Sequence, residues 1–144
     1  MSILIDQLYI FDLSDDLIAI LDPNDAETPF FDAYHFEQLN GQNTFNFKIP
    51  ANNDKAALII EGNQVAFKDL DGAFQLFEIK IVEEIHGEEL IKDIFCEHAV
   101  FELLDELILY QWDRDQSAST ILGHALSETV ASGTRWSVGT VSVA

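Results

Sequence analysis

The sequence contains a single cysteine, Cys96, so an intrachain disulfide is impossible. This cysteine lies in the apolar run Ile94-Phe95-Cys96, which predicts a buried and unreactive thiol. No apolar stretch approaches the ~20 residues that a membrane-spanning helix needs. The N-terminus also lacks the basic region and the small-residue cleavage site of a signal peptide. We therefore expect no stable membrane insertion.

Basic residues are scarce as well: Lys and Arg total 7 against 26 acidic residues, which gives a formal net charge of −19. Proteins that contact phosphates need clustered Lys and Arg. The charge balance therefore argues against sequence-specific nucleic-acid binding and against binding to an anionic membrane. It is typical of a solvated acidic surface, or of a surface that repels a polyanion such as DNA.

Apolar residues are plentiful, with 48% hydrophobic residues and 11 Phe spread along 144 residues. A chain of this length and composition can bury a core, either as one domain or as one domain and part of another. Turn residues between apolar runs predict a first hairpin over Leu8–Leu13 and Leu17–Leu21. A second pair of strands is predicted at Tyr34–Leu39 and Phe45–Ile49, joined at Asn40-Gly41.

The clearest local pattern is a hairpin over Gln64–Glu84, with Gly72 suited to a left-handed turn position. In its return strand the apolar residues fall on even numbers up to Leu76 and on odd numbers from Phe77. A regular strand cannot keep both sets on one face. We interpret this switch as a bulge near Leu76-Phe77; the alternative is a strand between two apolar surfaces.

After a further strand at Leu90–Phe95 the apolar spacing becomes helical. We expect helices over about 97–110 and 117–131, followed by an extended segment over 134–141. The fold class is therefore α+β, mainly antiparallel β, with a barrel- or sandwich-like domain and two helices. We place a β-rich domain at 1–115. Residues 116–144 would begin a second helix-plus-strand segment, truncated here, of a longer protein.

Residues that could support chemistry are present, but their spacing is uninformative. The candidates are four histidines, His35, His86, His98 and His124, and the acidic loop Asp22–Asp32 with Asp22, Asn24 and Glu27. The histidines lack zinc-site spacing, and the loop lacks the offsets of a calcium-binding EF-hand. We therefore predict no catalytic, cofactor-binding or metal-binding residues, and no enzymatic activity in this segment.

Aromatic residues exceed what a small core needs. The surplus consists of Phe30, Phe31, Tyr34, Phe36, Tyr110 and Trp112. Most are expected in the core, and some could line an oligomer interface, where aromatic residues are enriched.

The order of motifs resembles a known family. The series is FFDAYHFEQLNGQNTFNFKIP, EGNQVAFKDLDGAFQLFEIKIVEE, CEHAVFELLDELI and SASTILGHALSETVASGTRWSVGTV. It is similar to the N-terminal region of phage minor structural proteins, the tail-associated lysins or prophage tail endopeptidases. The resemblance implies a baseplate hub domain at the virion tail tip, made in the cytoplasm of the bacterial host, which closes or extends the tail tube.

The same resemblance implies a homotrimer and contacts with the distal tail protein and with tail-tube or tape-measure components. Enzymatic domains of such proteins lie C-terminal to this region, so lysin activity is not carried over to the chain. Two alternatives stay open. One is part of a cell-wall-degrading enzyme, and the other is a module that binds host-surface carbohydrate.

Overall fold

A computed structural model describes residues 5–27, 29–104, 115–127, 136 and 138–139. The chain forms two compact units, Met1–Ala99 and Val100–Ala144. Each unit is treated by itself below, and Met1–Ala99 is called the first unit. The domain boundary expected at residue 115 stays a prediction.

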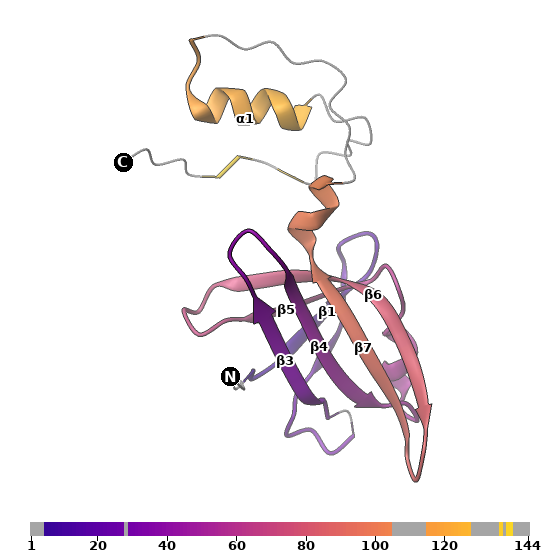
Figure 1. Ribbon diagram of the computed structural model, residues 1–144. Helices are drawn as coiled ribbons and strands as arrows, with labels where there is room; N and C mark the ends of the chain where they lie inside the picture. Colours follow the sequence, from indigo (N-terminus) through magenta and orange to yellow (C-terminus); the bar gives the residue numbers. More distant parts are fainter. Residues whose placement is uncertain (1–4, 28, 105–114, 128–135, 137, 140–144) are drawn as a thin grey trace. The chain divides into compact units, whose positions relative to one another are not determined.

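One antiparallel sheet forms the first unit (Figure 1). Its strands are β1 (Leu8–Phe11), β2 (Leu17–Leu21), β3 (Phe31–Glu37), β4 (Asn43–Pro50), β5 (Gln64–Lys68), β6 (Phe74–His86) and β7 (Leu90–His98). Their order is β2-β1-β5-β6-β7-β4-β3, and within the described residues this sheet is not closed. The mainly antiparallel β class is thus confirmed, whereas a barrel or sandwich stays a prediction.

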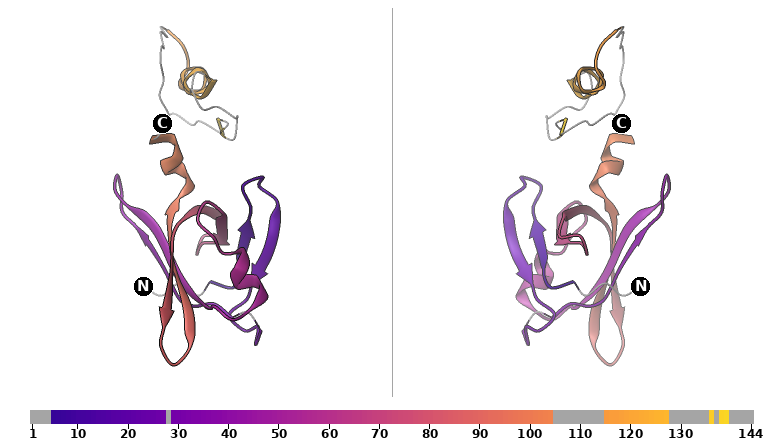
Figure 2. Two further views of the ribbon diagram at one scale, coloured as in Figure 1. Left: turned by 90° about the vertical axis from the view of Figure 1, so that its right-hand side faces the viewer. Right: turned by 90° about the vertical axis from the view of Figure 1, so that its left-hand side faces the viewer.

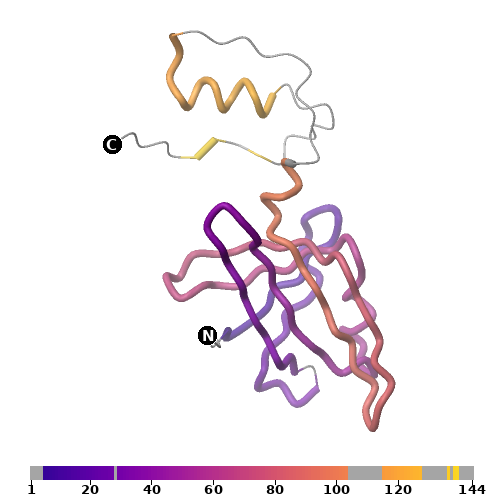
Figure 3. The backbone as a smooth tube through the Cα atoms, viewed as in Figure 1, coloured from indigo at the N-terminus to yellow at the C-terminus, as the bar shows by residue number. Residues whose placement is uncertain are grey.

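The sheet curves so that β1–β2 and β3–β4 lie on opposite arms (Figure 2). Figure 3 follows the backbone through this curve. Strand β4 shows why: Phe45, Phe47 and Ile49 are buried on the concave side, while the residues between them are half-buried on the other side. Period-2 alternation places one apolar set on a single face, and curving encloses that face. We call the concave side the inner face and the convex side the outer face.

Aromatic rings fill the inner face. The rings of Phe45 and Phe67 lie 4.6 Å apart between centroids, and Phe67 stacks on Phe77 at 5.4 Å. A short 3₁₀ helix, η1 (Asp54–Leu58), begins at Asn53, whose side chain accepts a hydrogen bond from the Ala56 amide. A single turn of helix is too short to show periodicity in the sequence.

The predicted bulge exists, but its predicted position is wrong. Strand β6 runs regularly past Leu76-Phe77, and its register against β7 shifts between Ile79 and Ile81. Ile79 pairs with Cys96 and Ile81 pairs with Phe95, so Lys80 is the extra residue. Phe74 and Leu76 lie on the outer face and Phe77 lies on the inner face, so this part of β6 is apolar on both faces.

The helix predicted over about 97–110 also differs from the structure. Strand β7 continues to His98, because His98 pairs with Phe77 in the sheet. A 3₁₀ helix, η2 (Ala99–Leu104), follows, and residues 105–110 lie outside the described residues. In the second unit, α1 (Ala118–Ser127) begins close to its predicted start. Residues 128–131, and most of the segment predicted as extended over 134–141, lie outside the described residues.

Candidate interaction surface

The outer face of β6, β7, β4 and β3 carries an apolar surface. Cross-strand pairing brings Ile81, Phe95, Asn46 and Tyr34 into one row across the four strands, and a second row contains Ile85, Ile91 and Pro50. Tyr34 is 45% exposed and Ile81 is 46% exposed. Large apolar side chains that share one solvent-facing surface are typical of interaction sites.

Acidic rows flank the first apolar row, at about 7 Å along the strands on either side. On one side Glu78 lies directly opposite Glu97, and on the other Glu83 lies directly opposite Asp93. Directly opposed like charges destabilise a sheet. Lys80 donates to Glu78 at 2.7 Å, which offsets part of the repulsion in one row. We call the two apolar rows, Phe36 and the four carboxylates the acidic–apolar face.

The two edges of the sheet differ. At β2, the Lys55 ammonium donates to the carbonyl oxygen of Ile20 at 2.8 Å, so η1 covers part of that edge. At β3, the register shifts between Phe31 and Tyr34, and Asp32 adopts a left-handed conformation with φ 51°. Both devices make an edge strand less able to pair with another chain. Tyr34 and Phe36 place the acidic–apolar face beside the β3 edge.

A polar cluster closes one end of the aromatic core. The Asp69 carboxylate accepts from the Gln75 amide at 2.7 Å, and the Gln75 oxygen lies 3.2 Å from His98 Nε2. The hydrogen bond to Gln75 lowers the pKa of Asp69. His35 Nε2 lies 2.9 Å from the Asn43 side-chain oxygen. These partners assign both Nε2 atoms as donors, and each imidazole ring meets Phe77 edge-on.

The two histidines of this polar cluster, His35 and His98, predict that the first unit loses stability in acid. Burial lowers the pKa of His98, nearby His35 lowers it further, and Glu37 opposes the shift. Because the folded pKa lies below the unfolded value of 6.5, the unfolded state takes up the proton first. The contribution of neutral His98 to the free energy of unfolding is therefore present above about pH 6.5 and is lost as the pH falls.

We expect the free energy of unfolding, from denaturant titrations, to fall modestly between pH 7.5 and pH 5.5. The variant His98→Gln keeps a donor to Gln75 but cannot titrate, so it should show a shallower decline. An identical pH slope in both proteins would contradict this assignment.

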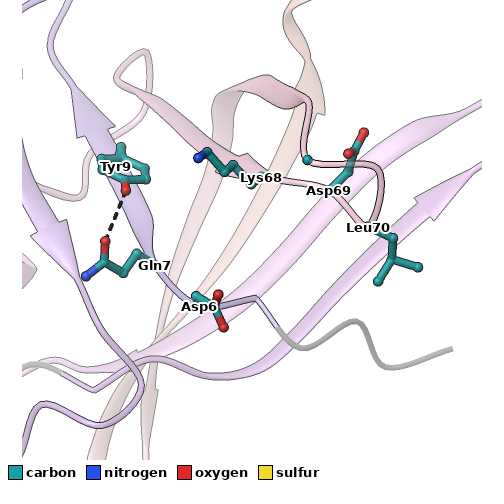
Figure 4. A pocket seen from close by; sticks show the side chains of 7 residues that line it. Asp6, Gln7, Tyr9, Lys68, Asp69 and Leu70 are labelled. Atoms are coloured by element: carbon teal, nitrogen blue, oxygen red, sulfur yellow. Dashed lines mark hydrogen bonds between the residues drawn. The ribbon is translucent and has the colours of Figure 1, made fainter.

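A pocket of about 370 Å³ lies between the start of β1 and the β5–β6 turn (Figure 4). It is lined by Asp6, Gln7, Tyr9, Lys68, Asp69, Leu70 and Gly72. The Tyr9 hydroxyl donates to Gln7 at 3.0 Å, and the Asp69 carboxylate is held by the backbone amides of Asp71 and Ala73. The Asp69 carboxylate is therefore engaged within the turn that joins β5 and β6, and the Tyr9 hydroxyl within the start of β1.

Within the first unit, the residues considered for metal binding do not gather at one place. His86 ends β6 and is exposed, His124 lies on α1 of the second unit, and the other two histidines face the core. In the acidic loop the Asp22 carboxylate accepts from the Asn24 amide, so it stabilises a turn. Among the described residues no three His, Cys, Asp or Glu side chains gather as a metal site.

The other candidates can be placed as well. Cys96 is buried, and burial raises its pKa, as expected for an unreactive thiol. Of the surplus aromatic residues, Phe30 is buried and Phe31 is half-buried, while Tyr34 and Phe36 are exposed. Tyr110 and Trp112 lie outside the described residues.

Sequence reasoning missed four members of the surface: Ile81, Ile85, Ile91 and Phe95. The bulge assigned to Leu76-Phe77 placed Ile81 on the same face as Phe77, and the sequence pattern assigned no face to Ile85, Ile91 and Phe95. Moving the bulge to Lys80 turns Val82 toward the core and Ile81 outward. The sequence feature that could have revealed this is the pair Ile81-Val82. These two adjacent apolar residues cannot both face inward in a regular strand.

The fold and surface define a class: a curved antiparallel β domain with an exposed apolar face. The family described as prophage endopeptidase tail N-terminal domain matches residues 8–98. This span begins at the first residue of β1 and ends at the last residue of β7. The chain belongs to that family and is a phage tail protein associated with the virion.

No curated protein matches the chain. The family match covers the N-terminal tail domain alone. Of the helices described, none is sufficiently long and apolar to cross a bilayer.

Proposed function

We propose that this chain is the N-terminal part of a tail-tip hub, which closes or extends the tail tube and anchors other tail-tip components. It acts as a homotrimer and contacts the distal tail protein and tail-tube or tape-measure components. Its role is structural, without catalysis in this segment. The observation that carries the proposal is the family match, which spans the whole seven-stranded sheet.

Two further observations support this role. The acidic–apolar face offers a surface for assembly, as a structural component requires. The net charge of −19 suits a protein beside a DNA channel, because carboxylates repel DNA and let it pass without adhesion.

Mass measurement in solution tests the assembly. Light scattering of the full chain should give three times the mass of the 16.2 kDa chain. Mixing it with the distal tail protein of the same phage should give a larger complex. A stable 16.2 kDa species that ignores that partner would contradict the proposal. Lysozyme-like release of dye from labelled cell walls by this chain would contradict the structural role.

A further inference from the structure

The acidic–apolar face has a specific electrostatic character. Where its first row crosses β6 and β7, at Ile81 and Phe95, it runs between two pairs of opposed carboxylates; on β4 and β3 the row continues through Asn46 and Tyr34. Phe95 is half-buried, whereas Ile81 and Tyr34 are nearly half exposed at the ends of the row. A surface that complements it needs an apolar ridge in the middle and positive charge on both sides.

The described first unit of a second copy does not offer that complement. The first unit contains five lysines, and each is already engaged. Lys48 pairs with Asp32, Lys55 with Asp25 and Lys80 with Glu78; Lys92 donates to the Ala56 carbonyl, and Lys68 lies over the Phe74 ring. Two copies meeting through this face would bring carboxylate rows together, which like-charge repulsion opposes.

The carboxylate pairs also point to an external partner. Glu83 and Asp93 face each other across β6 and β7, an arrangement that weakens the isolated sheet. Lys48 lies opposite Asp93 on β4 and is attracted by its charge, but the Lys48 ammonium pairs with Asp32 at 3.0 Å. Cations supplied by another protein would relieve the repulsion and gain charge-assisted contacts beside an apolar row.

We propose that the acidic–apolar face binds a different virion protein, through a surface of that protein on which an apolar ridge lies between Lys or Arg side chains. This deepens the proposed function and rests on it. The contacts between copies in the homotrimer then lie on another surface. Binding follows the usual pattern of an apolar centre with a charged rim.

Photo-cross-linking in assembled virions tests the occupant. A photoreactive phenylalanine analogue replaces Ile81 in the phage-encoded chain, virions are irradiated, and cross-linked peptides are identified by mass spectrometry. The matched control carries the analogue at Leu70, which is 68% exposed in the β5–β6 turn, away from the face. Both sites are solvent-exposed, so neither variant removes a core side chain.

The expected result is a cross-link from position 81 to another virion protein, at a segment that contains Lys or Arg beside apolar residues. A cross-link to a second copy, a cross-link within the same chain, or a yield at position 81 no higher than at position 70 would overturn the inference. A cross-link to a basic virion protein outside the tail tip would support this face but contradict the tail-tip role.

Charge removal then tests the acidic rows with the cross-linked protein as the probe. The double variant Asp93→Asn with Glu97→Gln should raise the dissociation constant at least roughly tenfold in low salt. The increase should be smaller in high salt. The control, Glu61→Gln with Asp71→Asn, removes the same charge from exposed loops and should change binding less than about twofold. Equal losses in both double variants would overturn the role of the rows.

Discussion

Replacing Phe67 with alanine should destabilise the first unit by about 3–5 kcal/mol. Phe67 is fully buried and contacts three rings: Phe45, Phe77 and the imidazole of His35. Truncation removes the apolar contacts and leaves a cavity that a curved sheet cannot close without moving its strands. Denaturant unfolding, followed by far-UV circular dichroism, should show a lower midpoint with an unchanged slope.

The matched control for this change is Phe74→Ala in the same hairpin. Phe74 is 59% exposed and contacts Tyr9 edge-on on the outer face. Its removal should cost about 1 kcal/mol or less, as is usual for a surface side chain. If both variants lost the same stability, the assignment of inner and outer faces would be wrong.

Deleting Glu78 should be far more damaging than deleting Lys80, two positions later. Glu78 belongs to the regular ladder, and its removal would force either Phe77 or Ile79 out of the core. The expected loss is about 3 kcal/mol or more, from exposing one large buried side chain. Circular dichroism and denaturant unfolding of the two deletion variants measure the difference.

Lys80 is instead the extra residue at the register shift between β6 and β7. Its deletion leaves Ile79 opposite Cys96 and Ile81 opposite Phe95, so every side chain keeps its face. The variant loses local twist and an ion pair with Glu78, and should remain folded with a loss of about 1–2 kcal/mol. Unfolding of the Lys80 deletion, with the Glu78 deletion tolerated, would place the bulge elsewhere.

Local chemistry accounts for the features that the sequence predicted well. Asn40 and Gly72 adopt left-handed conformations, as the turn signals indicated, and these depend only on the residues themselves. Strand β4 follows the alternation of its apolar residues, because one of its faces is fully enclosed. A resemblance in the order of motifs identified the family that residues 8–98 match.

Features that depend on pairing were harder to predict. The bulge at Lys80 is defined by β7, and alternation within β6 alone could not position it. The helical spacing after Val100 predicted a helix from about residue 97, whereas pairing of His98 extends β7 to that residue. The acidic–apolar face needs the register of four strands at once, so single-strand patterns could not reveal it.

The location of the chain on the virion tests the central claim most directly. Gold-labelled antibodies against residues 8–98, imaged on intact phage by electron microscopy, should mark the tip of the tail. Virions carrying the chain with a fused epitope at the β5–β6 turn serve as a second label. Labelling confined to the tail tip is the predicted result. Labelling along the tail shaft or on the capsid would contradict it. So would virions that neither label marks.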